Sequence, residues 1–334
     1  MPFRVVYILD DTTLSGGSKV VFEHARMLNK LALFRVYVLA PSGYPRWIHF
    51  PVPFISRKAE ETDLSEFDLI VTTFYSQSFL YERWREKSFL HFCQGFEGDY
   101  TKDLGLEHLN GAIESFYKLP YPKMAVTKFL TKKLRTLTNA PVFFVGQAVD
   151  KLLFKPVYDE VKNSVLIVGQ SEYPFKGVKR SLAVASELKN LLPYIKVVRV
   201  SPSDTRDEEM REFQIDEFWI GVPPYQMPKL YSKAIISIYL PYKEGFGLPV
   251  LESIASGVPV VASDIPSIKE ICGPKYPLCT SHKDALQLSI RILTDKNFYR
   301  RLVSIGIERS RRFSTHKLLF RLGTILLRTL AWRM

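Results

Sequence analysis

Short runs of apolar, mostly β-branched residues recur along the chain, and segments with helical periodicity separate many of them. Five runs lie in the first half, at 4–9, 34–39, 69–73, 89–93 and 142–145. Four more lie in the second half, at 165–168, 197–200, 235–239 and 258–262. Continuous apolar strands that alternate with helices are typical of parallel sheets covered on both faces. The two sets therefore predict an α/β protein with two doubly wound, Rossmann-like domains.

The boundary between the two sets is expected at 151–162, where Pro156 and mixed charge interrupt the pattern. We expect a first domain at 1–150 and a second at 163–312, followed by a C-terminal helix at 313–334. Ligands of doubly wound sheets bind beyond the carboxyl ends of the strands. Two such domains facing each other would enclose an interdomain cleft.

The segment from Glu244 to Glu252 is the strongest functional signal. An apolar strand precedes it, Gly245-Phe-Gly-Leu-Pro249 forms a turn, and a short helix that stops at Gly257 follows. Free backbone N–H groups at such a turn and helix start suit an anion. The two carboxylates, eight residues apart, can then address the two ends of one ligand. A nucleotide-sugar, with a diphosphate between two hydroxyl-rich ends, fits this arrangement.

Two other loops are candidates but are weak by themselves. Gly16 and Gly17 open a helix after the first strand, so their amides can cradle a phosphate, although a plain strand-to-helix turn also explains them. Lys176 lies in the loop after the first strand of the second domain, where it can bring a cation to a ligand. An ordinary surface lysine is the alternative.

The segment 234–270 resembles the signature of the retaining nucleotide-sugar glycosyltransferases of family four, the group 1 glycosyltransferases, which have the GT-B fold. The resemblance rests on Glu244–Glu252 and on Gly-Val-Pro-Val-Val-Ala-Ser-Asp, which ends at Asp264. Shorter similarities keep the family's order along most of the chain, at 16–28, 125–130, 146–156 and 230–234. In that family the segment corresponding to 125–130 is a helix, and the last helix crosses back to pack on the first domain.

The resemblance implies a role for each residue of the motif. Glu244 would contact hydroxyls of the donor sugar, and Glu252 would hold the ribose hydroxyls. The turn and helix start between them would line the sugar pocket through Gly245, Phe246 and Gly247, and would place amides at the diphosphate through Leu248 and Pro249. Gly17, with Gly16, would close over the diphosphate from the first domain, and Lys176 would neutralise charge on the leaving group.

The chain departs from the family pattern at two positions. Gln170 stands where an arginine is usual, and a neutral amide cannot offset diphosphate charge, so another cation would have to compensate: Lys176, Lys179, Arg180 or Arg199. Gln94 stands where the family often has a histidine at a strand end. His91 points to the opposite face of that strand, and we expect it to be packed or on the surface. Gln94 remains a candidate catalytic residue that hydrogen-bonds a sugar.

The family implies transfer with retention of configuration, through same-face attack in which the leaving phosphate takes the acceptor's proton. No general base is then required. No Asp-x-Asp motif occurs in the sequence, so we expect a hexosyltransferase that needs no divalent metal and no cofactor, with a nucleotide-diphospho-sugar as donor substrate.

The net charge of +12 is concentrated near the C-terminus. Residues 291–334 hold 11 Lys and Arg and 2 Asp and Glu, an excess of nine positive charges. On the C-terminal helix, Lys317, Arg321, Thr324 and Arg328 share one face, and Leu319, Leu322, Leu326 and Leu330 share another. A basic face suits binding to an anionic membrane surface. Such binding would bring the protein to a lipid-linked or glycan acceptor. A solvated basic face is the alternative.

No apolar run has the ~18–20 residues that span a bilayer, and the N-terminus goes straight into a strand without a cleavage site. Three cysteines are expected to be free thiols in a reducing compartment. We therefore expect a cytoplasmic protein, able to lie on the inner face of the membrane, with no nucleic-acid partner. Two rivals stay open: a sugar-nucleotide-binding protein with little or no turnover, and a basic membrane- or nucleic-acid-binding module.

Overall fold

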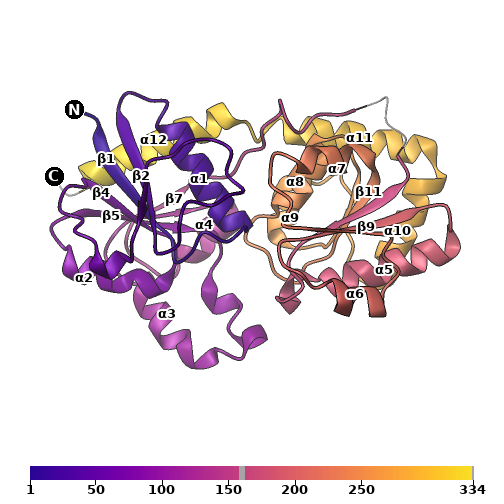
Figure 1. Ribbon diagram of the computed structural model, residues 1–334, viewed down its shortest axis with the longest axis horizontal. Helices are drawn as coiled ribbons and strands as arrows, with labels where there is room; N and C mark the ends of the chain where they lie inside the picture. The colour runs from indigo at the N-terminus through magenta and orange to yellow at the C-terminus, as the bar shows by residue number, and fades with distance from the viewer. Residues whose placement is uncertain (158–161, 333–334) are drawn as a thin grey trace. The chain divides into compact units, whose positions relative to one another are not determined.

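The computed structural model describes residues 1–157 and 162–332, and these form two compact units. The first unit comprises Met1–Gln147 and Thr315–Met334, and the second comprises Ala148–Ser314. Each unit is built on one parallel sheet flanked by helices (Figure 1). The α/β class with two doubly wound sheets, predicted from the apolar runs, is confirmed. Residues 158–161 of the expected linker lie outside the described residues.

The sheet of the first unit has seven strands in the order β3-β2-β1-β4-β5-β6-β7, and all neighbouring pairs are parallel. The strands are β1 (Phe3–Ile8), β2 (Phe34–Ala40), β3 (Phe54–Ser56), β4 (Leu69–Thr72), β5 (Ser88–Cys93), β6 (Lys123–Ala125) and β7 (Val142–Phe144). The central strands β4 and β5 are buried along their whole length. Burial on both faces explains why they read as continuous apolar runs.

The α-helices among the described residues of this unit are α1 (Gly16–Leu28), α2 (Phe79–Arg83), α3 (Asn110–Tyr117), α4 (Lys128–Leu134) and α12 (Thr315–Ala331). Because the strands are parallel, the loops after β1, β4 and β5 emerge at the same edge of the sheet. That edge carries Gly16 and Gly17, the loop around Tyr75, and the segment that begins at Gln94.

Helix α12, drawn in yellow in Figure 1, packs against α1 and β5. Its buried stripe is Leu318, Leu322, Leu326 and Leu330; Leu319, which the sequence suggested, is only half-buried. The predicted basic face included Arg321, but this residue packs inward. Its guanidinium lies 5.0 Å from the Phe144 ring centre and donates to the Val145 carbonyl at 3.4 Å. Only Lys317 and Arg328 of the three basic residues are exposed.

The sheet of the second unit has five parallel strands in the order β10-β9-β8-β11-β12. The strands are β8 (Ser164–Val168), β9 (Lys196–Ser201), β10 (Glu217–Ile220), β11 (Ala234–Tyr239) and β12 (Val260–Ala262). The helices are α5 (Val178–Leu191), α6 (Arg206–Glu212), α7 (Met227–Lys233), α8 (Leu248–Ala255), α9 (Pro266–Cys272), α10 (His282–Thr294) and α11 (Lys296–Ser310). The strand order changes direction between β8 and β11, and ligands of such sheets bind at that point.

Three strands lack the pattern used to predict the others. β3 and β6 have three residues each, β6 contains Lys123, and β10 is an edge strand with an exposed Trp219. The segment 125–130, expected to be helical, begins instead as the end of β6. The helix starts at Lys128, because the Thr127 side chain caps it by accepting from the Leu130 N–H.

Candidate functional site

The loop and helix after β11 form the centre of the site. Gly247 has φ 106° and precedes the first residue of α8, and a Cβ at this position would lie 2.6 Å from the Ile268 side chain. Only glycine therefore permits this entry into the helix. Leu248 and Pro249 occupy the first turn of α8, but proline has no N–H. Of these two residues only Leu248 offers an amide to an anion, which corrects the expectation for Pro249.

Glu244 lies in this loop and forms an ion pair. Its Oε2 atom is 2.8 Å from Lys176 Nζ and accepts a hydrogen bond from the Tyr239 hydroxyl at 2.5 Å. Burial raises the pKa of the carboxyl, but the charge and hydrogen bonds of Lys176 and Tyr239 outweigh it and hold the pKa below its usual value. Glu244 is therefore an ionised acceptor of hydrogen bonds at neutral pH.

Lys176 reaches Glu244 because two loops pack closely together. It ends the 3₁₀ turn Pro174–Lys176, and Gly177 follows with φ 62°. A Cβ on Gly177 would lie 1.9 Å from the Leu240 carbonyl oxygen, so a larger residue would push the loop off the end of β11. The Tyr242 N–H also donates to the Phe175 carbonyl at 2.8 Å. The predicted cation and the predicted carboxylate are thus adjacent, although 68 positions separate them.

Glu252 lies on α8, about one turn after Leu248, and is only 6% exposed. Its Oε2 atom accepts from the hydroxyl of Tyr231, which is fully buried on α7, at 3.3 Å. The same hydroxyl lies 3.2 Å from the Pro249 carbonyl. A single buried tyrosine therefore connects Glu252 to the first turn of the helix, and burial together with Glu252 raises the pKa of Tyr231 well above its usual value.

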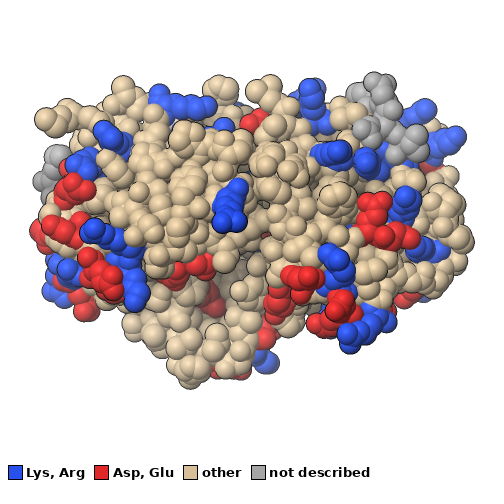
Figure 2. Space-filling model, in the orientation of Figure 1, with Lys and Arg blue, Asp and Glu red and all other residues tan. Residues whose placement is uncertain are grey.

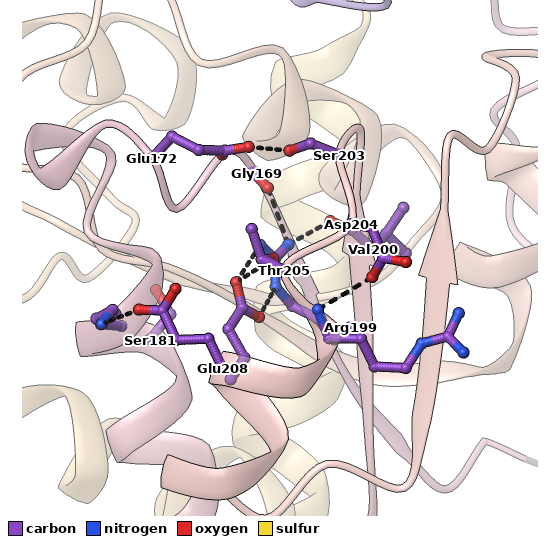
Figure 3. Close-up of polar contacts among 12 residues, drawn as sticks. Gly169, Glu172, Ser181, Arg199, Val200, Ser203, Asp204, Thr205 and Glu208 are labelled. Atoms are coloured by element: carbon purple, nitrogen blue, oxygen red, sulfur yellow. Dashed lines mark hydrogen bonds and ion pairs between the residues drawn. The ribbon is translucent and has the colours of Figure 1, made fainter.

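Arg199 is not available to compensate for Gln170. It is fully buried on β9 and makes a two-point pair with Glu209 of α6, with Nε–Oε2 at 2.6 Å and Nη2–Oε1 at 3.0 Å. Its Nη1 atom donates to the Gly169 carbonyl at 2.9 Å (Figure 3). The Thr205 hydroxyl donates to Glu209 Oε1 at 2.8 Å. Arg199 therefore fixes the loop that carries Gln170 from behind.

The other candidate cations differ in their surroundings. Lys179 is exposed and pairs with Glu208 and Glu212 of α6. The guanidinium of Arg180 lies 5.1 Å from the ring centre of Tyr242, itself exposed. Of the four cations that the sequence suggested, Lys176 is the one in contact with the Glu244 motif.

In the first unit, Gly16 and Gly17 begin α1, which Ser15 caps by accepting from the Ser18 N–H at 3.0 Å. Gln94 Nε2 donates to the Gly17 carbonyl at 3.3 Å, and a Cβ on Gly17 would be 3.3 Å from that same nitrogen. Gln94 and Gly17 are thus together at the edge of the sheet. His91 is fully buried, with Nδ1 3.0 Å from the Thr72 hydroxyl, and burial lowers its pKa to about 3.

Two tyrosines of the site, Tyr231 and Tyr239, were missed by the sequence reasoning. Tyr239 is the last residue of β11, directly before the glycine-rich loop. An aromatic hydroxyl at a strand end beside two carboxylates is a signal that could have been noticed. The contact of Tyr231 with Glu252 depends on the packing of α7 against the sheet and leaves no mark in the sequence.

The described residues contain no group of three or more His, Cys, Asp or Glu side chains arranged to hold a metal ion. Within the same residues, no helix combines the length and apolar character that a membrane crossing requires.

Comparisons with known proteins identify the second unit. Residues 149–309 match the family described as "Glycosyl transferases group 1". The chain is 28% identical over 135 residues to the MMP alpha-(1->4)-mannosyltransferase of Mycolicibacterium hassiacum, which is 39% of this chain and 33% of that protein. It is 34% identical over 105 residues to O-antigen chain mannosyltransferase B of Escherichia coli, 29% of this chain and 27% of that protein. The chain thus spans about a third or less of these relatives.

Solved structures share the fold over nearly the whole chain. Sucrose-phosphate synthase from Thermosynechococcus elongatus superposes with a TM-score of 0.81 at 17% identity, covering 98% of this chain and 99% of that one. HepE from Anabaena, in complex with UDP-glucose, gives 0.78 at 11% identity, covering 97% and 99%. The fold is GT-B, and residues 149–309, which lie within the second unit, match the group 1 glycosyl transferases.

Proposed function

We propose that the protein transfers a hexose from a nucleoside-diphosphate sugar to a hydroxyl of a glycan or lipid-linked acceptor, with retention at the anomeric carbon and without a metal ion. The observation that carries the proposal is a pair of carboxylates on either side of the N-terminus of α8, Glu252, which is buried, and Glu244, which is half-buried. The family match and the mannosyltransferase relatives support it.

Each end of the donor has a partner in this proposal. Glu252 accepts hydrogen bonds from the ribose hydroxyls, and the Tyr231 hydroxyl keeps one of its oxygens in place. The Leu248 amide and the N-terminus of α8 receive the diphosphate. Glu244, held ionised by Lys176 and Tyr239, accepts from hydroxyls of the sugar, and Gly245, Phe246 and Gly247 line the sugar pocket.

The transfer breaks the bond between the anomeric carbon and the diphosphate oxygen, and the acceptor oxygen forms its bond on the same face. The leaving phosphate gains negative charge and takes the proton of the acceptor hydroxyl. Lys176 lies beside Glu244 and is the cation that stabilises this charge. Gln170 and Gln94 contribute neutral hydrogen bonds only.

The same neutral residues support one rival, a protein that binds sugar nucleotides with little turnover. Both functions require donor binding, and they differ in the release of nucleotide when donor and acceptor are present together. Mannose is the first sugar to test, because the relatives are named mannosyltransferases. UDP-glucose is the second, because HepE was crystallised with it.

We also propose that an acceptor carried by lipid is reached through contact of α12 with an anionic membrane surface. Lys317 and Arg328 are exposed on this helix beside Phe320, which is 76% exposed, and Trp332 follows the helix at 57%. Basic and aromatic side chains together suit the interface of an anionic bilayer. On the face drawn in Figure 2, by contrast, basic side chains are interspersed with acidic ones.

A thermal-shift screen across GDP-mannose, UDP-glucose, related nucleotide-sugars and their parent nucleotides tests donor binding. A true donor at 100 times its dissociation constant adds ~2.7 kcal/mol of stability. We expect one nucleotide-sugar to raise the melting temperature more than its parent nucleotide does. Equal shifts with every compound, or none, would contradict a donor site.

A further inference from the structure

Glu97 is a carboxyl group that the donor chemistry does not use. It is half-buried and opens the 3₁₀ turn Glu97–Asp99, three residues after Gln94 at the carboxyl end of β5. Its Oε2 atom accepts a hydrogen bond from the hydroxyl of Tyr117 at 2.5 Å. Tyr117 ends α3 and is fully buried. The carboxyl group is therefore held by a rigid neighbour at an edge of the sheet where ligands bind.

The surroundings of Glu97 offer it no cation. Among the described residues no Lys, Arg or His forms an ion pair with it. The nearby Lys133 pairs with Asp99 instead and lies 4.5 Å from the ring centre of Phe96. The ionisable side chains that interact with Glu97 are Tyr117 and the buried thiol of Cys93. Burial raises the pKa of Glu97 to about 7, and the hydrogen bond from Tyr117 opposes that rise.

Neighbouring loops bring groups that suit a sugar. The backbone of Tyr75, in the loop after β4, lies near Glu97 and favours the ionised form of that carboxyl, which lowers its pKa. Phe74 is 40% exposed, and its ring centre lies 4.8 Å from that of Tyr75. A carboxylate accepts hydrogen bonds from hydroxyls, and an exposed ring packs against the apolar face of a pyranose. Both lie at the edge of the sheet that also carries Gln94.

We propose that Glu97 binds a hydroxyl of a carbohydrate acceptor and orients that acceptor for transfer. The inference rests on the glycosyltransferase function proposed above. Tyr117 fixes one carboxylate oxygen, and the acceptor hydroxyl donates to the carboxylate. The proton of the attacking hydroxyl still moves to the leaving phosphate, the anomeric carbon exchanges one oxygen for the other, and Glu97 keeps its own protonation state throughout.

A pH dependence of acceptor binding follows. An ionised carboxylate accepts from a hydroxyl through either oxygen, whereas the protonated acid has lost part of this capacity. Acceptor affinity should therefore rise with pH through about 7 and level off above it. Glutamine at position 97 keeps the size and the acceptor for Tyr117, but it cannot ionise.

Saturation-transfer NMR with methyl α-mannoside, α-glucoside, α-galactoside and α-rhamnoside, followed from pH 5.5 to 8.5, tests the assignment on the full chain. We expect at least one glycoside to bind the wild type, with affinity that rises near neutral pH. Glu97→Gln should weaken this binding about ten- to hundred-fold at pH 8 and abolish its pH dependence. Tyr117→Phe removes the hydrogen bond that lowers the pKa of Glu97, so the midpoint should move to higher pH. Glu114→Gln, an exposed change on α3, is the matched control and should alter nothing.

Equal binding by the wild type and Glu97→Gln, an unchanged midpoint in Tyr117→Phe, or no binding of any glycoside would overturn the assignment. Calorimetry with nucleotides on the same proteins separates this failure from failure of the proposed function. If the wild type binds no nucleotide, the donor site itself is wrong. If nucleotides bind equally to the wild type and to Glu97→Gln while glycoside binding is also equal, only the role of Glu97 is lost.

Discussion

Lys176 is the residue whose position says most about the chemistry, because it is the one candidate cation beside Glu244. Lys176→Ala should lower turnover and weaken nucleoside diphosphate binding, since loss of a comparable electrostatic partner costs ~2.7–4 kcal/mol in the transition state. Lys179→Ala is the control, because Lys179 is exposed and pairs with α6. Steady-state kinetics compares the two. Similar rates for both variants would show that Lys176 does not face the diphosphate.

A second prediction concerns His24, which is fully buried on α1 between Tyr7 and Phe92. No described residue hydrogen-bonds either of its ring nitrogens. Burial lowers its pKa to about 3, whereas in the unfolded chain it is ~6.5. The unfolded state thus binds a proton that the folded state excludes. The stability that comes from keeping His24 neutral is fully present above pH ~6.5. The free energy of unfolding then decreases as the pH falls from ~6.5 towards 3.

His24→Leu removes this titration. The free energy of unfolding, measured in urea at pH 7.5 and 4.5, should fall less on acidification in the variant than in the wild type. The expected difference between the two decreases is roughly 2–3 kcal/mol. Equal decreases would show that His24 is protonated in the folded protein.

At the scale of elements, the buried pair of Arg199 and Glu209 joins β9 and α6 to the loop that follows β8. Glu209→Leu alone should destabilise the protein by ~3–5 kcal/mol, because it leaves a buried charge unpaired. Arg199→Met together with Glu209→Leu should recover most of that stability. Nucleotide affinity should stay low in the double variant, because it lacks the Arg199 guanidinium that donates to the Gly169 carbonyl. Recovery of both, measured by urea unfolding and calorimetry, would assign the pair to stability alone.

Helix α12 carries the prediction about membranes. The protein should co-sediment with vesicles rich in anionic lipid, but not with neutral vesicles, and salt should weaken the binding. Lys317→Glu with Arg328→Glu should reduce it about tenfold or more, since each charge near the surface is worth ~1 kcal/mol. Arg300→Glu with Arg301→Glu, exposed on α11 of the other unit, is the matched control. Equal sedimentation with both vesicle types, or equal loss in both variants, would remove this role.

For the whole molecule, the sequence predicted the two sheets because strands such as β4 and β5 are buried on both faces and are mostly apolar. It missed β6, where Lys123 is fully buried only because its amine donates to the carbonyls of Leu119 and Tyr121. No local sequence pattern predicts that these backbone carbonyls will accept from the lysine. Short edge strands such as β10 could not be predicted either. Neither face of β10 is fully covered, so its residues do not form an apolar run.

The candidate site was predictable where the signal is local and was not where it depends on tertiary contact. Glu244, Gly247 and Glu252 belong to one strand–turn–helix element that can be recognised from its own residues. The contact of Lys176 with Glu244 joins loops 68 positions apart and needs the close approach at Gly177. The pairing of Arg199 with Glu209 likewise depends on a tertiary contact, with α6. The sequence reasoning was therefore wrong to propose Arg199 as a cation for the ligand.

The central claim is that the two carboxylates bind different parts of one donor. Glu252 binds the nucleotide, and Glu244 binds the sugar. Calorimetry of the best nucleotide-sugar and of its parent nucleoside diphosphate, on the wild type, Glu252→Ala and Glu244→Ala, tests it most directly. Glu252→Ala should weaken both ligands by about ten- to hundred-fold, from the ~1.5–3 kcal/mol of a charged hydrogen bond. Glu244→Ala should weaken only the nucleotide-sugar. Equal losses for the two ligands in Glu244→Ala, or unchanged nucleotide affinity in Glu252→Ala, would contradict this division.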